Sequence, residues 1–203
     1  MTDLDRTATQ SRTKQPPAKR DRLVLAARDL IHSQGIERTT LADVAEASGV
    51  PLGNVYYYFK TKNELVAAVV NSRMQELTDL LDSLDALPSP VDRLKGMIQA
   101  AEAKVDEIVE SGCPMGTLCT ELEKRDDGLA AGAAALMRHH IDWVANQFRL
   151  MGHDDDAGEF ALAFVSGYQG AAVLTNALRD PQVLIQESRR IQRWVDSLAA
   201  SSG

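Results

Sequence analysis

The chain has 203 residues, of which 44% are hydrophobic and 25% charged, a composition typical of soluble globular proteins and sufficient for a substantial core. No apolar run approaches the roughly 20 residues that cross a bilayer, and the polar N-terminus lacks the apolar stretch of a secretory signal, so we expect a cytoplasmic protein with no membrane partner. Two cysteines, Cys113 and Cys119, are too few for a disulfide framework.

The net charge of -7 is unevenly distributed along the chain. Residues 1–62 contain ten Lys and Arg against seven Asp and Glu, a net charge of +3, and the remainder carries -10. A mildly basic head can approach phosphates while an acidic body keeps the protein in solution. The charge pattern therefore permits a nucleic-acid partner without requiring one.

Residues 1–18 are rich in Thr, Gln, Ser, Pro and charged side chains and have almost no large apolar ones. Such a segment cannot bury enough surface to offset its ordering entropy, so it predicts a disordered tail. The basic residues at this end either follow a DNA groove or are simply solvated, and the sequence favours neither interpretation. They are Arg6, Arg12, Lys14, Lys19, Arg20 and Arg22.

Helical periodicity begins at Lys19, and an apolar stripe predicts a first helix that Gly35 ends. Thr40, with Asp43 three residues later, predicts the N-terminal cap of a short second helix. Gly49 ends that helix after two turns, and a third short helix follows over residues 51–58.

These two short helices, joined at Ser48-Gly49-Val50, make a helix-turn-helix, in which the second helix enters the major groove of DNA. Val55 and Phe59 are its predicted inward side chains. The three consecutive tyrosines at 56–58 cannot all be buried, because neighbouring helical residues point about 100° apart. We therefore expect at least one ring to face outward, where its hydroxyl can reach a phosphate and its ring a thymine methyl.

The rest of the chain also reads as helices. Thr61 and Glu64 form a full capping box for the fourth, which ends before Pro88. Further helices are predicted over residues 89–111, from about 115 to 125, and over 129–151, 154–178 and 184–199. About nine helices and no strands predict an all-α fold.

The stretch VPLGNVYYYFKTKNELV resembles the signature of the tetracycline-repressor (TetR) family, and TTLADVAEASGV before it matches as well. The resemblance implies an N-terminal three-helix helix-turn-helix domain (19–66) joined to a helical ligand-binding and dimerisation domain (67–200). It also implies a repressor that binds a palindromic double-stranded DNA operator as a homodimer and is released by a small-molecule effector. Tyr58 departs from the family pattern, in which His is frequent at this position.

By this resemblance, one group of residues contacts the DNA backbone and another faces base edges. The backbone group comprises Thr39 or Thr40, Tyr57, Tyr58 and Lys62, with Lys60 as a further candidate. The base-facing group comprises Pro51, Leu52, Gly53, Asn54 and Tyr56. Lys62 also fits on its own chemistry, as a cation beside the start of the fourth helix. The alternative is that the tyrosines and Leu52 cover an interface between helices.

The middle helices would surround the pocket of an apolar or aromatic effector, whose binding would shift the fourth helix and change the spacing of the recognition helices. Methionines adapt to varied ligand shapes, and a few polar groups set orientation. The alternative for any one of these residues, and the commoner role for such side chains, is plain core. The candidates are Met97, Met115, Leu118, Cys119, Met137, His140, Ile141, Val144, Phe148, Phe164 and Tyr168.

The last two helices are the expected dimer interface, by resemblance, with burial inside the chain as the alternative. The expected contacts are Phe160, Phe164, Gly167, Tyr168, Gly170, Ala171 and Leu174 on the first of these helices and Ile185, Ile191, Trp194, Val195 and Leu198 on the second. Small residues among large ones would let two helices approach closely.

A cysteine, a pair of histidines and the possibility of an enzyme remain to be interpreted. Cys113, near a helix start, either senses oxidants or electrophiles or is a small buried thiol. His139 and His140 with Asp142 do not suggest a metal site, because adjacent side chains diverge on a helix, and we expect no cofactor. No phosphate loop or nucleophile motif indicates an enzyme. A DNA-binding protein that responds to no ligand is a closer alternative to the regulator than an enzyme is.

Overall fold

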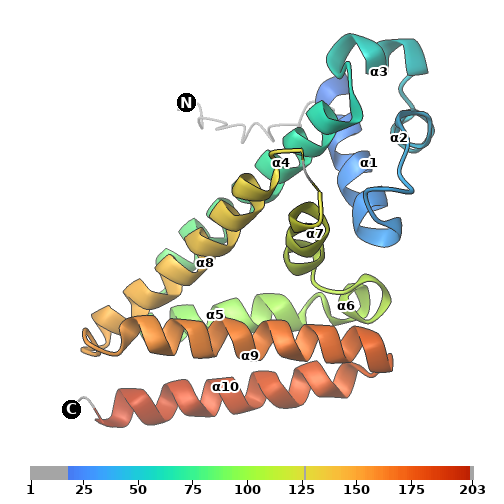
Figure 1. Cartoon of the computed structure of the whole chain (residues 1–203). Helices are drawn as coiled ribbons and strands as arrows, with labels where there is room; N and C mark the ends of the chain where they lie inside the picture. The colour runs from blue at the N-terminus through green and yellow to red at the C-terminus, as the bar shows by residue number, and fades with distance from the viewer. Residues whose placement is uncertain (1–17, 126, 202–203) are drawn as a thin grey trace, which may run out of the picture.

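The computed structural model describes residues 18–125 and 127–201, and within them the chain forms ten helices and no strand, which confirms the all-α prediction (Figure 1). The bounds are α1 (Lys19–Gln34), α2 (Leu41–Ser48), α3 (Leu52–Tyr58), α4 (Lys62–Asp85), α5 (Pro90–Glu102), α6 (Val105–Ser111), α7 (Pro114–Glu123), α8 (Ala130–Leu150), α9 (Ala157–Leu178) and α10 (Pro181–Ser201). None of these helices combines the length and apolarity that a bilayer crossing needs. The expected tail, with Arg6, Arg12 and Lys14, lies outside the described residues except for Ala18.

The helix expected over 89–111 is divided in two. α5 ends before Ala103, and the backbone turns at Lys104, whose φ and ψ are -107° and 18°. Neither residue is a glycine or proline, so no local signal predicts the break. α6 buries Ile108 against α9 and α10, and this tertiary packing favours the turn over a straight helix.

The helix caps at the N-terminal end follow the sequence closely. The Thr40 hydroxyl accepts the Asp43 N–H at 3.1 Å, and the Asp43 carboxylate accepts the Thr40 N–H at 2.9 Å. The bond that the carboxylate accepts from the Thr40 backbone, with a smaller contribution from the Thr40 side chain, holds the pKa of Asp43 below its ordinary value. Thr61 caps α4 in the same way, but Glu64 accepts from the N–H of Lys60, at 2.7 Å, rather than from that of Thr61. The full capping box expected there is thus extended by one residue.

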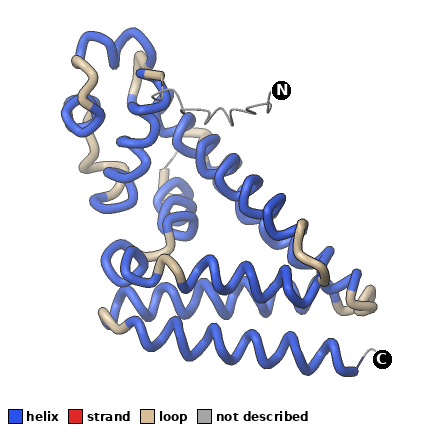
Figure 2. The backbone as a smooth tube through the Cα atoms, turned by 180° about the vertical axis from the view of Figure 1, so that it is seen from behind, coloured by secondary structure: helices blue, strands red, loops and turns tan. Residues whose placement is uncertain are grey.

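The helices form a triangle (Figures 1 and 2). α4 and α8 pack along each other on one edge, while α5, α9 and α10 pack together at the base. α7 lies between them and contacts α8 and α1. α1, α2 and α3 gather at one corner, around the first turns of α4, and so project the helix-turn-helix away from the body.

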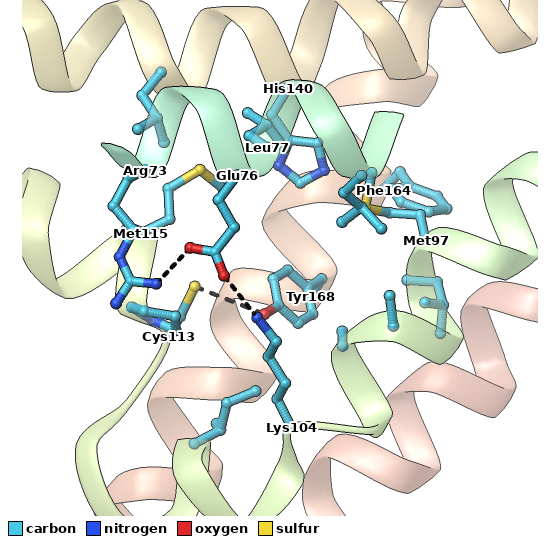
Figure 3. A pocket seen from close by; sticks show the side chains of 17 residues that line it. Arg73, Glu76, Leu77, Met97, Lys104, Cys113, Met115, His140, Phe164 and Tyr168 are labelled. Atoms are coloured by element: carbon cyan, nitrogen blue, oxygen red, sulfur yellow. Dashed lines mark hydrogen bonds and ion pairs between the residues drawn. The ribbon is translucent and has the colours of Figure 1, made fainter. Parts of the chain in front are cut away.

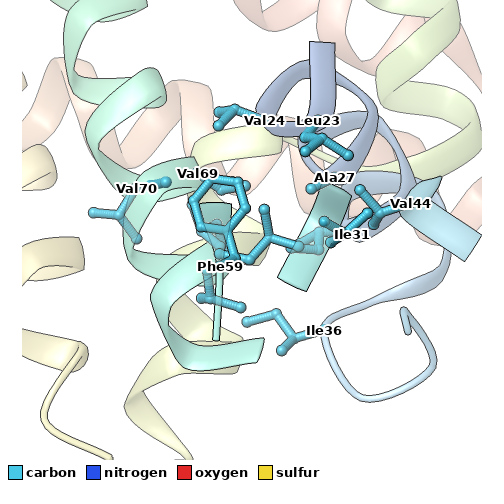
Figure 4. Close-up of a cluster of buried hydrophobic side chains, with 14 of the residues drawn as sticks. Leu23, Val24, Ala27, Ile31, Ile36, Val44, Phe59, Val69 and Val70 are labelled. Carbon is cyan, nitrogen blue, oxygen red and sulfur yellow. The ribbon is translucent and has the colours of Figure 1, made fainter. Parts of the chain in front are cut away.

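Two large apolar clusters, with a smaller one around Ile108 and Leu184, stabilise this arrangement. The N-terminal cluster joins α1, α2, α3 and the first half of α4 around Leu23, Val55 and Phe59 (Figure 4), and Leu118 and Leu122 of α7 complete it. The body cluster joins α4, α5, α8, α9 and α10 around three aromatic rings, those of Phe148, Phe160 and Phe164. Because α7 contributes to the N-terminal cluster, the corner is packed onto the body rather than tethered to it.

Candidate nucleic-acid interface and ligand pocket

The turn between α2 and α3 sets the direction of the exposed helix. Gly49 adopts the left-handed conformation, with a φ of 62°, and its N–H reaches the Glu46 carbonyl at 3.1 Å. A Cβ there would meet nothing within 4 Å, so backbone conformation rather than space selects glycine. Val50 and Val55 are buried on either side of the turn and fix α3 to the corner.

The outward face of α3 carries aromatic rings. Tyr57 is 74% exposed and Tyr56 49%, whereas Tyr58 is half-buried and meets the Tyr57 ring edge-on at 5.1 Å. This confirms that the tyrosine triplet cannot all be buried. Leu52 is 41% exposed, an unusual position for a large apolar side chain on a short helix. Pro51 and Gly53 are exposed beside it, and Asn54 is partly buried.

Of the two candidate threonines, Thr39 is removed from the surface. Its side chain is buried, its hydroxyl donates to the Gly35 carbonyl at 2.8 Å, and the Gln34 amide donates to it at 3.3 Å. Thr40 is exposed, although its hydroxyl caps α2. The sequence pattern could not separate the pair, because only the position of the turn after α1 decides which hydroxyl points inward.

The two candidate lysines flank the base of α3. The Lys60 ammonium donates to the Tyr56 carbonyl at 2.7 Å, and that of Lys62 donates to the Glu37 carbonyl at 3.0 Å. An ammonium has three N–H donors, so each lysine keeps donors for a phosphate oxygen. Lys60, which contacts the backbone of Tyr56, is exposed, and Lys62 is half-buried.

A cavity of about 210 Å³, partly open to solvent, lies in the body and is lined from α4, α5, α6, α7, α8 and α9 (Figure 3). Its walls are mostly apolar, as those of small-molecule sites usually are. Five of the candidate ligand residues line it: Met97, Met115, His140, Phe164 and Tyr168.

The other six candidates do not line this cavity. Leu118 and Cys119 turn toward the N-terminal cluster. On α8, Met137 and Ile141 are about 100° around the helix from the lining residues that precede them. Val144 and Phe148 continue the lining stripe but lie further along α8, inside the body cluster. Periodicity identified the right face of α8 but not where the cavity ends.

His140 is the most unusual group in the cavity wall. It is 3% exposed, and neither ring nitrogen has a hydrogen-bond partner. Burial, with a smaller effect of the neighbouring His139 charge, lowers the pKa of His140 to about 4. The ring is therefore neutral at neutral pH, with one donor and one acceptor unused.

Both cysteines are free thiols. Cys113 caps α7, where its sulfur accepts the Gly116 N–H at 3.4 Å, and the Tyr168 hydroxyl points at it from 3.6 Å. Burial, and then Cys113, raise the pKa of Tyr168. Burial, with a smaller contribution from Cys113, raises the pKa of Cys119 to about 11, and its thiol donates to the Ala133 carbonyl. Cys119 is thus a protonated, packed side chain.

The sequence analysis missed the charged mouth of the cavity, which is formed by Arg73, Glu76 and Lys104. Arg73 donates to the Glu76 carboxylate at 2.8 Å, and Lys104 lies 3.3 Å from the other carboxylate oxygen (Figure 3). Burial raises the pKa of Glu76, but the Arg73 hydrogen bond and the nearby cations outweigh it and leave the pKa lowered. In sequence, Arg73 and Glu76 look like an ordinary surface pair three residues apart.

α7 connects the cavity to the helix-turn-helix corner. Its first residues, with Cys113 before them, line the cavity. Near its other end, Glu121 accepts the Ile36 N–H at 2.6 Å, in the turn between α1 and α2. Gly35 in that turn has a φ of 85°, and a Cβ there would lie 3.2 Å from the Glu121 carboxylate. His32 of α1 also bonds the Gly112 carbonyl, at 2.9 Å.

α9 presents an uncovered apolar stripe. Four of its side chains are between 53% and 67% exposed: Leu162, Val173, Leu174 and Leu178. Beside them a groove between α9 and α10 is lined by Gly167, Gly170 and Arg190 among others. Four of the twelve expected interface residues (Phe164, Ala171, Ile191 and Val195) are buried within the chain, Gly170 and Leu174 are exposed, and the other six are partly buried, so the exposed face coincides only in part with the predicted one.

Two family models match the chain: "Bacterial regulatory proteins, tetR family" over residues 23–69, and "Transcriptional regulator LmrA/YxaF-like, C-terminal domain" over residues 90–190. A Pseudomonas putida protein named "Probable HTH-type transcriptional regulator ArpR" is 32% identical over 200 residues, which cover 92% of each chain. An uncharacterized HTH-type transcriptional regulator of Mycobacterium tuberculosis is 30% identical over 179 residues, 79% of this chain and 86% of that protein.

Solved structures share the fold. The regulatory protein TetR from Rhodobacter sphaeroides superposes with a TM-score of 0.76 at 24% identity, over 85% of this chain and 96% of that one. A TetR transcriptional regulator from Legionella pneumophila gives a TM-score of 0.80 at 17% identity, over 90% and 98% of the two chains. These relatives are named as regulators rather than enzymes.

Proposed function

This chain belongs to the tetR family of bacterial regulatory proteins and is a DNA-binding transcriptional regulator, and we propose that it is an effector-released repressor. In this proposal a homodimer holds a palindromic operator in the absence of ligand. A small molecule with an apolar body fills the cavity and lowers the affinity of the dimer for DNA.

The exposure of Tyr57 and Tyr56 on the recognition helix carries the proposal. Leaving two aromatic rings in water at the tip of a capped helix-turn-helix costs hydrophobic free energy that a DNA contact recovers. We assign the Tyr57 hydroxyl to a phosphate and the Tyr56 ring to a base edge. Lys60 and Lys62 add sequence-independent contacts to the backbone.

Dimerisation follows from the reach of a single recognition helix, which covers only a few base pairs. The stripe that includes Leu162, Leu174 and Leu178 supplies an apolar surface of the kind that a twin subunit covers. In a two-fold dimer the same stripe meets itself, which suits a palindromic operator.

Effector release requires a path from the cavity to the corner. α4 lines the cavity through Leu77 and Leu80 and carries the N-terminal cluster on its first turns. α7 lines it through Met115 and holds the Ile36 N–H through Glu121. A ligand that prefers one position of these two helices shifts the population of dimers able to bind DNA. The cavity favours this proposal over a ligand-independent DNA-binding protein.

Selection of bound fragments from genomic DNA by the purified protein tests the proposal, followed by gel-shift titration on the enriched sequence. We expect a palindrome, and we expect Tyr57→Ala to weaken binding to it and to unrelated DNA similarly. Leu150→Ala, which removes another exposed apolar side chain (57%) at the far end of α8, is the matched control and leaves affinity unchanged. Recovery of no common sequence, or equal effects of the two variants, would contradict DNA recognition through α3.

A further inference from the structure

Building on the proposed function, we propose that the effector is an organic anion whose apolar body enters the cavity and whose acidic group binds at the mouth, between Arg73 and Lys104. This assignment names the chemical class that the cavity selects.

The mouth has more positive than negative charge. Arg73 and Lys104 share the single carboxylate of Glu76, at 2.8 and 3.3 Å. Arg28 of α1 approaches the same carboxylate at 3.6 Å, while Asp29 offsets its charge at 3.1 Å. One unit of positive charge is therefore left over at the mouth, in a protein whose net charge is -7.

The remainder of the cavity gives no countercharge. Glu76 is the only acidic residue among the side chains that line the cavity in the described part of the chain. The inner wall is formed by side chains such as Met97, Leu136 and Phe164, and His140 is neutral. The cavity therefore attracts an anion only at its mouth. A cation would be repelled there by Arg73 and Lys104.

His140 independently indicates a bound molecule. Its two ring nitrogens are buried and unpartnered, an arrangement that costs free energy unless a ligand supplies a hydrogen bond. The ring lies in the wall formed by α8, apart from the ion pairs at the mouth (Figure 3). A ligand held by its acidic group at Arg73 and Lys104 would bring its body past His140.

The ion pairs at the mouth also connect the ligand to the corner. Arg73 is only 11% exposed in its side chain, so a second anion beside it forms a charge-assisted hydrogen bond with little competition from water. Glu76, at 37%, is free to turn toward solvent when it is displaced. Displacement of Glu76 changes its contact with Arg28 on α1, and by linkage DNA binding changes ligand affinity in return.

Two fluorescent probes with the same ring system test the assignment: 8-anilinonaphthalene-1-sulfonate, which carries one acidic group, and N-phenyl-1-naphthylamine, which carries none. Both are titrated into the full-length protein and its variants. We expect Lys104→Gln to weaken the sulfonate about three- to fivefold and Glu76→Gln to strengthen it similarly, because each change alters one partly exposed charge. The uncharged probe keeps its affinity within about twofold in every variant.

Lys95→Gln is the control, because Lys95 also stands in an ion pair, with Asp196, but does not line the cavity. Affinities of the two probes that move together in the variants, or do not move at all, overturn the anion assignment. Failure of the sulfonate to bind the wild type overturns it as well. Gel-shift titration of the same preparations without probe reports separately on the proposed function: a wild type that binds no operator would refute the repressor while leaving the probe results interpretable.

Discussion

The helix-turn-helix corner and the cavity differ in how their buried polar groups are satisfied. At the corner, the buried Thr39 hydroxyl donates to the Gly35 carbonyl four residues away, and even the exposed Thr40 hydroxyl is bonded, to the Asp43 N–H. In the body, His140, Gln169 and Thr175 each have a buried side-chain atom without a partner, and in the described part of the chain such atoms occur on these three residues alone.

This difference corresponds to two different tasks. A surface that reads DNA must hold its side chains in one geometry, and short-range caps and a filled cluster achieve this locally. A site that senses a ligand must instead gain free energy from binding, and the unpartnered ring of His140, the one of these three residues that lines the cavity, provides that gain. The two regions are therefore expected to respond differently to similar mutations.

The largest expected difference between the two regions is in the free energy of unfolding that is lost when a buried leucine is truncated. Leu23→Ala at the corner and Leu77→Ala in the cavity wall remove the same atoms from buried sites. Such changes cost about 2.7–5.0 kcal/mol, and the cost rises with the new void. We expect Leu23→Ala to fall near the upper limit and Leu77→Ala near the lower one, because the space beside Leu77 is already open to solvent. Denaturant unfolding measures both, and equal costs would mean that the cavity wall is as rigid as the corner.

The second difference concerns pH. The folded pKa of His140 is about 4, below its usual 6.5, so between these values the unfolded chain binds a proton that the folded chain does not. The free energy of unfolding therefore falls as the pH is lowered through this window, by up to about 3 kcal/mol from this residue. His140→Leu should remove most of that dependence and stabilise the protein at pH 7 by about 1 kcal/mol, since it eliminates an unpartnered polar group.

Urea titrations between pH 4 and 7 measure this effect, with His139→Leu as the adjacent control. If His140→Leu keeps the wild-type slope, His140 has a partner or is exposed in solution, and the contrast with the corner weakens.

Removing a helix-capping hydroxyl at the corner should give a smaller effect on the free energy of unfolding, but a larger one than removing a hydroxyl on α7. Thr40→Ala removes the hydroxyl that caps α2 and should cost about 1 kcal/mol, together with a loss of operator affinity, because α2 positions α3. Thr120→Ala removes a hydroxyl on α7 that bonds carbonyls of its own helix, those of Gly116 and Thr117, each at 2.9 Å. We expect this control to change the free energy of unfolding by less than about 0.5 kcal/mol. Thermal unfolding and gel-shift titration are carried out on both variants. A similar loss of stability and operator affinity in each would contradict a special role of the Thr40 cap.

The same contrast explains which features could be predicted from sequence. The caps at Thr40 and Thr61, the turn at Gly49 and the outward tyrosines depend on residues a few positions apart, and local rules identified them. Thr39 was not separated from Thr40, because its burial depends on how the turn after α1 folds back.

In the body, the sequence identified residues that face inward but could not show where the space between helices lies. His140 and Val144 are one turn apart on the same stripe of α8, yet only His140 lines the cavity, because neighbouring helices fill the space around Val144. Lys104 was not identified because the break that brings it to the mouth depends on the packing of α6 against α9 and α10. Long-range packing of this kind leaves no signature in a single sequence.

The smallest expected effect concerns the contact between Arg28 and Glu76, which connects the corner with the mouth of the cavity. If Glu76 transmits ligand binding to α1, Arg28→Gln should reduce the loss of operator affinity that 8-anilinonaphthalene-1-sulfonate causes, by about two- to threefold, because the contact is long and partly exposed. Asp29→Asn is the control, since it removes the other partner of Arg28 and leaves the contact with Glu76 in place. Operator affinity is titrated with and without the probe for each variant. A coupling unchanged in Arg28→Gln would assign transmission to α7 and its Glu121 contact with the Ile36 N–H, and would leave the ion pairs at the mouth with a role in binding alone.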